Sequence, residues 1–315
     1  MKEIMASAIG RDDIRAARER IAPHVRVTPA VEAGTGAFGV DASLTMKLEL
    51  LQHTGSFKPR GAFNKMLSSD VPDDGVIAAS GGNFGLAVAY AARELGHRAE
   101  IFIPDTSPVA KIDRVRAQGA GVRVVPGYYD EASAAARERA NETGALWMHP
   151  FDQPEVVAGG GTVGMEISSQ TPDADTILVA IGGGGLIAGI AAWFRGDVRI
   201  VGVEPAACPT MHAALENGAP IAVKVGGVAA DSLGSRMVGD IAFGIARSFV
   251  DRVVLVPDDS IEDAQRRLWT ELHVIAEPGG AASLAALLAG AYRPAPGERV
   301  VVLVCGANTD PASVA

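Results

Sequence analysis

The sequence predicts an α/β protein built on parallel sheets, and three observations lead to this prediction. Short apolar runs of strand length alternate along the chain with longer segments that have helical spacing. Parallel strands need crossover helices, which this alternation supplies. Several apolar runs end in glycine-rich segments, and glycine accounts for 37 of the 315 residues, or about 12% against a usual ~7%.

The first half of the chain predicts one helix and one strand, followed by an alternating block. Residues 11–21 have the charged amphipathic pattern of a helix, which Pro23 would end. Residues 43–48 have the pattern of a short strand. The block then consists of strands 75–80, 99–104, 122–125 and 145–149, separated by helices 86–95, 111–118 and 130–142.

A second alternating block begins near Gly159. We expect two α/β units, a smaller one of residues 74–150 and a larger one that combines residues 1–73 with residues 151–315. The predicted elements of the second block are helix 164–170, strand 176–181, helix 186–194, strands 199–204 and 253–256, helices 260–272 and 280–290, and strand 299–305.

The composition excludes several classes of protein. Apolar residues make up 48% and charged residues 21%, which is typical of a globular chain rather than a disordered one. Since 28 basic residues are outnumbered by 37 acidic ones, for a net charge of −9, we expect no nucleic-acid partner. The uncharged stretch 176–194 approaches the length of a membrane span, but five of its 19 residues are glycine, so we expect no membrane association.

Two further features favour a cytoplasmic location. The two cysteines, Cys208 and Cys305, form no disulfide framework and lie outside any CxxC pair. Residues 1–20 contain acidic side chains and no long apolar core, so they do not resemble a secretory signal. We therefore expect a protein of a reducing compartment.

Three glycine-rich motifs lie where predicted strands end, which is where ligands bind in parallel sheets. They are Ser80-Gly-Gly-Asn83, Gly182-Gly-Gly-Gly-Leu186 and Cys305-Gly-Ala-Asn308. Four glycines between a strand and a helix let backbone N–H groups converge on a phosphate at the positive end of the helix dipole. No Lys-Ser/Thr pair follows, so this is not a nucleoside-triphosphate loop. The alternative is that these glycines only allow close packing of helix and sheet.

A dinucleotide site is a second interpretation of the same loop. Gly183-x-Gly185-x-x-Ala188 fits the dinucleotide fingerprint, and Glu204 ends the next strand about 20 residues later. Taken alone, this pattern favours a NAD-dependent oxidoreductase. The fingerprint usually opens the first strand–helix–strand unit, however, whereas here it lies past the middle of the chain.

Lys58 is the candidate nucleophile, because it lies between Phe57 and Pro59. We expect Pro59 to keep Lys58 out of helical conformation and to begin a helix at its first position. A lysine held on a rigid turn beside an aromatic ring is well placed to form an imine. The alternative is an exposed lysine without a chemical role.

Six segments together resemble a known family: Thr54-Gly-Ser-Phe-Lys-Pro-Arg-Gly-Ala62, Ser80-Gly-Gly-Asn-Phe-Gly85, Gly182-Gly-Gly-Gly-Leu186, Val203-Glu-Pro205, Glu277-Pro-Gly-Gly-Ala281 and Cys305-Gly-Ala-Asn308. They resemble the fold-type II pyridoxal-phosphate enzymes, and most closely the branch of threonine/serine dehydratases and serine racemases. The resemblance covers nearly the whole chain, with the segments in the same order. It implies the fold of the tryptophan synthase β-subunit, with two open, twisted parallel sheets and flanking helices.

The resemblance implies a role for each matching residue. Lys58 would be the Schiff-base lysine and, once released, the general base that removes the Cα proton. Glu277 would lie near the cofactor ring, or would only place a negative charge at a helix N-terminus. Phe57 would pack against the ring, Asn83 would bond its phenolic oxygen, and Cys305 would face its pyridine nitrogen. Gly182, Gly183, Gly184, Gly185 and Leu186 would bind the cofactor phosphate, and Ser80, Gly81, Gly82 and Asn83 would bind the substrate carboxylate.

Three positions depart from the pattern of the family. Gly81 stands where members with racemase activity have a serine, so the second face of the substrate would lack its proton donor. Phe84 stands where many members have histidine. Cys305 and Ala307 replace residues of a Ser-Gly-Gly-Asn motif, as in the serine dehydratase subgroup. A neutral Cys305 would not stabilise a pyridinium, which favours prompt β-elimination.

The resemblance also implies a cation site. Glu204, Cys208 through its carbonyl, and Thr210 match positions that coordinate a cation in the family. One carboxylate with neutral oxygens suits K⁺ or Na⁺ better than a divalent ion. The alternative is that Glu204 is a solvated acid at a strand end.

The resemblance therefore implies a cytoplasmic, homodimeric, pyridoxal-phosphate-dependent dehydratase, an ammonia-lyase that converts L-threonine or L-serine to a 2-oxo acid and ammonia. The alternatives are a serine racemase of the same fold, the NAD-dependent oxidoreductase and a catalytically silent binding protein. Only seven residues follow Asn308, so we expect no regulatory domain and no response to isoleucine.

Overall fold

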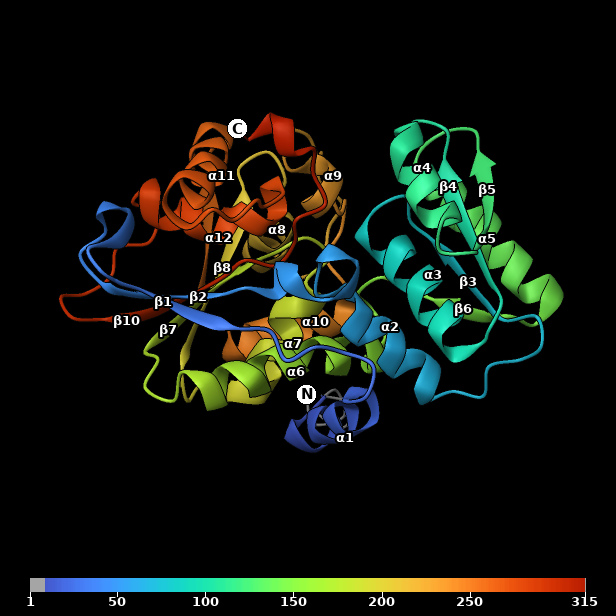
Figure 1. Cartoon of the computed structure of the whole chain (residues 1–315), viewed down its shortest axis with the longest axis horizontal. Helices are drawn as coiled ribbons and strands as arrows, with labels where there is room; N and C mark the ends of the chain where they lie inside the picture. Colours follow the sequence, from blue (N-terminus) through green and yellow to red (C-terminus); the bar gives the residue numbers. More distant parts are fainter. Residues whose placement is uncertain (1–8, 315) are drawn as a thin grey trace.

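The computed structural model describes residues 9–314 and contains two β-sheets flanked by helices (Figure 1). The larger sheet has six strands in the order β1-β2-β10-β7-β8-β9, and the smaller has four in the order β5-β4-β3-β6. The strands of the larger sheet are β1 (Ala30–Thr35), β2 (Ser43–Lys47), β7 (Thr176–Ala180), β8 (Arg199–Pro205), β9 (Arg252–Val256) and β10 (Arg299–Leu303). Those of the smaller sheet are β3 (Val76–Ala79), β4 (Ala99–Pro104), β5 (Gly121–Val125) and β6 (Leu146–Met148).

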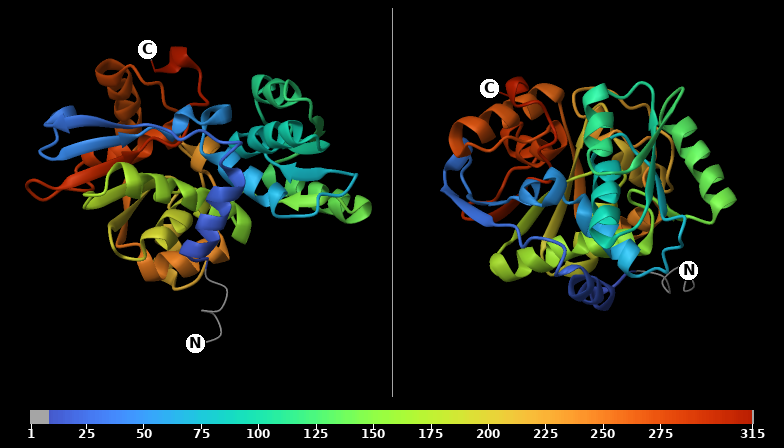
Figure 2. Two further views of the ribbon diagram at one scale, coloured as in Figure 1. Left: turned by 60° about the horizontal axis from the view of Figure 1, so that its bottom comes forward. Right: turned by 45° about the vertical axis from the view of Figure 1, so that its right-hand side comes forward.

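The helices lie in layers on both sides of each sheet. Helices α11 and α12 cover one face of the larger sheet, and α6, α7 and α10 lie on the other, with α1 packed outside α6 (Figures 1 and 2). In the described part of the chain the α-helices are α1 (Arg11–Ile21), α2 (Lys58–Leu67), α3 (Asn83–Leu95), α4 (Val109–Arg116), α5 (Tyr129–Thr143), α6 (Pro154–Gln170), α7 (Gly185–Phe194), α8 (Thr210–Asn217), α9 (Ala230–Leu233), α10 (Asp240–Phe249), α11 (Asp258–Leu272) and α12 (Pro278–Leu288).

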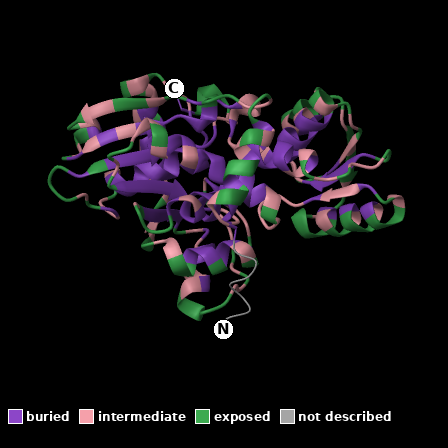
Figure 3. Cartoon of the chain, turned by 90° about the horizontal axis from the view of Figure 1, so that it is seen from below, coloured by how far each residue is buried: buried purple, intermediate pink, exposed green. Residues whose placement is uncertain are grey.

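The predicted α/β class with parallel sheets is confirmed. Every neighbouring pair of strands is parallel except β1 and β2. The central strands β3 and β7 are buried at every residue, which explains why they read as continuous apolar runs. Figure 3 shows the buried residues concentrated in the sheets and on the inner sides of the helices.

The sequence pattern does not predict strand β1 and predicts only the end of helix α6. Strand β1 is partly exposed and its register shifts between Glu32 and Gly34, so it lacks a regular alternation. Helix α6 begins at Pro154 rather than at residue 164, because glycines 159–161 conceal its helical pattern. These glycines let α6 pack closely on its neighbours, since a Cβ at Gly161 would come within 2.9 Å of the Gly189 carbonyl oxygen.

The expected conformation of Lys58 is wrong. Helix α2 begins at Lys58, with Pro59 in its first turn. A proline in the first turn only removes an N–H group that has no partner within the helix, so it can follow a helical residue there. The preceding Phe57 is already in the right-handed helical region, and its carbonyl accepts a hydrogen bond from the Arg60 N–H at 3.1 Å.

The uncharged stretch 176–194 forms β7, the glycine loop and α7. Among residues 9–314, no helix is long and apolar enough to cross a membrane. We expect no secretory signal in residues 1–20, and residues 1–8 of this stretch lie outside the described residues.

Candidate functional site

A cavity of about 960 Å³ lies at the carboxyl ends of strands from both sheets. The segments that follow β3, β6 and β7 all contribute to its wall, as parallel sheets require. The residues proposed from the sequence that line it are Lys58, Ser80, Gly81, Gly82, Asn83, Gly182, Gly183 and Glu277. Five other proposed residues lie near this lining: Phe57, Gly184, Gly185, Leu186 and Cys305. The proposed cation ligands form a separate group near the start of α8, which consists of Glu204, Cys208 and Thr210.

The Lys58 amine lies in the cavity between two aromatic rings. Its Nζ is 4.9 Å from the ring centroid of Phe57 and 5.6 Å from that of Phe84, and it donates a hydrogen bond to the Pro150 carbonyl at 3.0 Å. Burial lowers the pKa of Lys58 to about 8, although its electrostatic interactions with the nearby Cys305 and Glu277 partly oppose this. About a tenth of the amine is therefore neutral at pH 7, so Lys58 can act as a nucleophile or a base.

A chain of hydrogen bonds fixes the amide of Asn83. Its Nδ2 donates to Glu277 Oε1 at 2.6 Å, and its Oδ1 accepts from Asn308 Nδ2 at 2.6 Å. Asn308 in turn donates to the Thr54 carbonyl at 2.8 Å and accepts from Arg114. Burial raises the pKa of Glu277, and the bond from Asn83 only partly offsets this. The orientation of Asn83 is therefore set from both of its ends.

Cys305 is a buried, neutral thiol. Burial raises its pKa to about 12, with the nearby Glu277 acting in the same direction. Its Sγ lies 3.4 Å from the Gly279 carbonyl oxygen, to which it donates. This position offers no negative charge at neutral pH.

The glycine loop after β7 packs closely against neighbouring residues at the N-terminus of α7. Gly184 has a φ of 90°, in the left-handed region, and immediately precedes α7. A Cβ at Gly183 would lie 2.2 Å from the ring of Phe151, and one at Gly184 would lie 2.6 Å from Ala242. Side chains are therefore excluded from a loop that places backbone N–H groups at the N-terminus of a ten-residue helix.

The loop that precedes α3 is tightly packed at Gly81. The Ser80 hydroxyl accepts a hydrogen bond from the Gly82 N–H at 3.2 Å. A Cβ at Gly81 would lie 2.6 Å from Ser107 Oγ and 3.0 Å from Ile103 Cγ2. The φ of Gly81 lies outside the left-handed region, so space, not backbone strain, limits the residue at this position.

Glu204 lies at the end of strand β8, but its carboxylate reaches the N-terminus of α8 and is not in solvent. It is completely buried, and its two oxygens accept from the Met211 and His212 N–H groups at 2.7 and 2.9 Å. Burial raises its pKa to about 7. The Cys208 carbonyl accepts from the Thr210 N–H at 3.0 Å. These contacts contradict the solvated alternative, and they leave Glu204 no access to the ribose of a dinucleotide.

Sequence reasoning missed His149, which lines the cavity beside Pro150. Its Nδ1 accepts from the Asp152 N–H at 2.9 Å, and burial lowers its pKa to about 4, so its ring is neutral. The available signal was a polar residue at the end of the predicted strand 145–149. Arg60 was also missed, although it lies within the quoted lysine motif.

Comparison with known proteins agrees with this geometry. Residues 21–306 match the family described as pyridoxal-phosphate dependent enzyme. An L-threonine ammonia-lyase of Geobacter sulfurreducens is 41% identical over 302 residues, which are 94% of this chain and 75% of that protein. An L-threonine ammonia-lyase of Thermotoga maritima is 36% identical over 95% of this chain and 75% of its own. The solved structure of maize serine racemase has a TM-score of 0.90 at 32% identity and covers 98% of this chain and 95% of its own.

Proposed function

Because the chain belongs to the family of pyridoxal-phosphate-dependent enzymes, we propose that it is an ammonia-lyase that converts L-threonine to 2-oxobutanoate and ammonia. L-Serine, which would give pyruvate, is the second substrate of the same chemistry. The observation that carries the proposal is the Lys58 amine, which lies in the cavity with a pKa lowered to about 8. The names of the relatives at 36% and 41% identity support this substrate.

The residues of the site fit pyridoxal phosphate. The glycine cradle, Gly182 to Gly185 with Leu186, would hold a phosphate, because it lies at the N-terminus of α7 and its first two glycines line the cavity. Lys58 would hold the aldehyde as a Schiff base, and Phe57 and Asn83 would contact the ring. When bound, the cofactor supplies an electron sink that acidifies the Cα–H of an amino acid.

The residues of this chain would then bind the substrate and move its proton. The N–H groups of the loop from Ser80 to Asn83, at the N-terminus of α3, would bind the substrate carboxylate. Lys58 Nζ would take the Cα proton, since its lowered pKa leaves part of the amine neutral. Cys305 would keep its proton and leave the cofactor ring uncharged at this position, which favours loss of the β-hydroxyl over a long-lived carbanion.

The test is to incubate the purified protein with pyridoxal phosphate and L-threonine and to measure 2-oxobutanoate and ammonia together. We expect the two products in equal amounts and a visible absorption band that borohydride removes. Formation of D-serine from L-serine without any 2-oxo acid would instead support the serine racemase. Absence of the visible band would contradict both the ammonia-lyase and the racemase.

We also propose that K⁺ or Na⁺ binds at Glu204, Cys208 and Thr210. The donor set fits a monovalent ion, because one buried carboxylate lies beside the Cys208 carbonyl and the Thr210 hydroxyl. The Thr210 hydroxyl currently donates to the Ser235 carbonyl at 2.7 Å, which adds a fourth oxygen to the group.

K⁺ is expected to raise the melting temperature by roughly 3 °C at ten times its Kd, because a ligand of the folded state alone stabilises it. The melting temperature is measured in potassium chloride and in tetramethylammonium chloride at equal ionic strength. Glu204→Gln should abolish the difference, and Glu216→Gln, at an exposed position on α8, should retain it. Equal melting temperatures of the wild type in the two salts would exclude the site.

We further propose a cytoplasmic homodimer. The two cysteines are buried free thiols, as in proteins of reducing compartments. Val27 and Leu51 are 60% and 45% exposed, and they belong to neighbouring segments, which Arg26 joins by donating from Nη1 to the Leu51 carbonyl at 2.8 Å. This apolar surface supports a contact between two copies of the chain, which sedimentation measures as a mass of two chains.

A further inference from the structure

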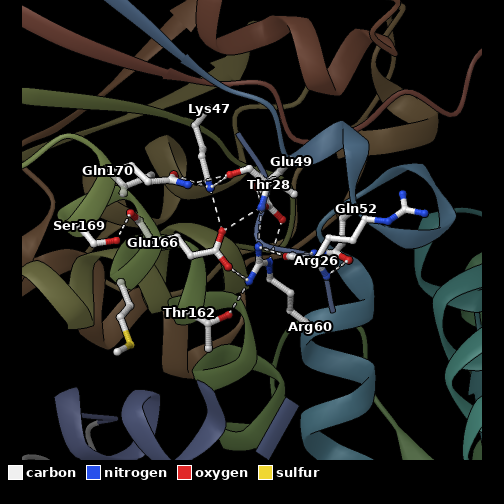
Figure 4. Close-up of polar contacts among 12 residues, drawn as sticks. Arg26, Thr28, Lys47, Glu49, Gln52, Arg60, Thr162, Glu166, Ser169 and Gln170 are labelled. Carbon is white, nitrogen blue, oxygen red and sulfur yellow. Dashed lines mark hydrogen bonds and ion pairs between the residues drawn. The ribbon is translucent and has the colours of Figure 1, made fainter. Parts of the chain in front are cut away.

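Four charged side chains form a buried ion cluster beneath helix α2 (Figure 4). The cluster consists of Lys47 of β2, Glu49 of the turn after β2, Arg60 of α2 and Glu166 of α6, and each side chain is at most 5% exposed. The four residues lie outside the lining of the cavity. The two positive and two negative charges balance within the cluster.

Every N–H group of Arg60 has an acceptor in this cluster or beside it. Nε and Nη2 donate to the two oxygens of Glu49 at 2.8 and 2.7 Å, which forms a bidentate fork. Nη1 donates to Glu166 Oε1 at 2.8 Å and to Thr162 Oγ1 at 3.2 Å, and Nη2 also donates to the Arg26 carbonyl at 3.3 Å. Burial opposes the charge of Arg60, but the two carboxylates outweigh it and raise its pKa. Arg60 is therefore held in a single orientation.

Lys47 completes the cluster without touching α2. Its Nζ donates to Glu166 Oε2, to the Thr28 carbonyl and to Gln170 Oε1 at 2.7 to 2.8 Å. A buried ion pair of this kind is seldom more stabilising than apolar residues of the same volume. Stability alone therefore explains the cluster poorly. Its directional bonds indicate that it holds neighbouring elements in a fixed orientation.

The packing of α2 shows why the rotation of its first turn, which sets the direction of Lys58, needs to be fixed. Residues two apart on a helix are about 200° apart around its axis, so Lys58 and Arg60 point in nearly opposite directions. Helix α2 meets α6 where glycines replace side chains: a Cβ at Gly159 would lie 2.4 Å from the Arg60 carbonyl oxygen, and one at Gly61 would lie 2.9 Å from Val156 Cγ1. The first turn of α2 therefore meets α6 mainly through backbone atoms, whereas its later turns are held by Phe63 and Met66 in the core and by Asn64, whose Nδ2 donates to the Glu155 carbonyl at 2.6 Å.

We propose that Arg60 is a positioning residue for Lys58. Its fork to Glu49 and its bond to Glu166 fix the rotation of the first turn of α2, which keeps Lys58 Nζ in the cavity against the Pro150 carbonyl. Lysine at position 60 could not replace it, because an ammonium lacks the planar fork. The inference rests on the proposed function, in which Lys58 forms the imine.

Two double variants test this role, and each keeps a different one of the three ion pairs of the cluster. Arg60→Met/Glu49→Gln releases α2, whereas Lys47→Met/Glu166→Gln keeps the Arg60–Glu49 fork. The first readout is the rate at which the full chain forms its visible imine band after pyridoxal phosphate is added. We expect this rate to fall about 10- to 100-fold in the first variant only, since small misplacements of a reacting group have effects of this size.

The second readout needs neither the cofactor nor any catalysis. Reductive methylation of the cofactor-free full chain with formaldehyde, followed by peptide mass analysis, gives the pH dependence of the reactivity of Lys58. In the first variant the apparent pKa of Lys58 should rise from about 8 toward 10.5, because the amine leaves its buried position. Glu277, Cys305 and His149, which lie near Lys58, are unchanged in both variants.

The outcomes separate positioning from mere stability. Arg60→Lys, which keeps the charge but loses the fork, should show the same slow imine formation and shifted profile, and it serves where a double variant does not fold. The proposal would be overturned if the two double variants formed the imine at equal rates and had equal methylation profiles. It would also be overturned if the Arg60→Lys protein formed the imine at the wild-type rate. If the proposed function fails instead, the wild type forms no imine band, while the methylation profiles still report whether Arg60 positions Lys58.

Discussion

Replacing Lys58 by alanine is expected to reduce the deamination of L-threonine by roughly 100- to 10,000-fold, the range typical of losing a positioned general base. The loss has a physical cause in the site, since Lys58 is the basic side chain held between Phe57 and Phe84 with its Nζ in the cavity. The measurement is 2-oxobutanoate formation by the purified variant with pyridoxal phosphate.

Borohydride trapping identifies the lysine directly. The wild type should yield one reduced cofactor adduct, on the peptide that contains Lys58, and Lys58→Ala should yield none. Lys65→Ala is the matched control, because Lys65 lies on the same helix and pairs with Glu155 at 3.1 Å. Recovery of the adduct on any other lysine of the wild type would remove Lys58 from the mechanism.

The same substitution has an expected effect on the stability of the cofactor-free protein. The pKa of Lys58 is about 8 in the folded chain and near 10.5 in the unfolded one, so the unfolded chain binds more protons between these values. The resulting penalty on folding is fully present below pH 8 and disappears as the pH rises toward 10.5. Lys58→Ala should therefore raise the melting temperature at pH 7 more than at pH 10.

Much of the site could be predicted because its residues follow the strands of parallel sheets. The motifs at Ser80, Gly182 and Cys305 are far apart in the sequence, yet the carboxyl ends of their strands bring them to one region. Glycine and asparagine stand out in such positions, since apolar core strands contain few of them. Lys58 was singled out by its neighbours Phe57 and Pro59, and its role as the Schiff-base lysine came only from the resemblance to the family, while the start of its helix was predicted wrongly.

The rest could not be predicted, because it depends on contacts between distant residues. Arg60 bonds Glu166 across 106 positions and Lys47 bonds Glu166 across 119, and no local pattern marks such partners. Helix α6 was shortened because its glycines serve packing against α2 and α7, which overrides helix propensity. The boundaries of the two units at residues 74 and 150 stay a proposal, supported by the smaller sheet, whose strands all lie within residues 76–148.

Elimination is expected to exceed racemisation in the wild type by a wide margin. Racemisation returns a proton to the substrate Cα from the face opposite Lys58. Gly81 stands at the position where racemases are expected to have a serine that donates this proton. Water is an unpositioned donor and forfeits much of the roughly 100- to 10,000-fold that a placed acid supplies. With L-serine as substrate, pyruvate should therefore form in large excess over D-serine.

Introducing a serine at position 81 should shift this balance, provided that room is made for it. The backbone of Gly81 is compatible with any residue, but a Cβ there would lie 2.6 Å from Ser107 Oγ and 3.3 Å from Ser107 Cβ. The informative variant is therefore Gly81→Ser/Ser107→Gly, in which the opposing side chain is removed. Ile103 Cγ2, at 3.0 Å from the same Cβ, must then shift by a few tenths of an ångström.

Gly81→Ala/Ser107→Gly is the matched control, because it adds the same Cβ without the hydroxyl. If the missing proton donor limits racemisation, the ratio of D-serine to pyruvate should rise at least about tenfold in the serine variant relative to the alanine variant. Equal ratios would show that the hydroxyl at this position delivers no proton. D-Serine matching or exceeding pyruvate in the wild type would overturn the ammonia-lyase proposal in favour of the racemase, since a chain with glycine at this position would then have another donor on that face.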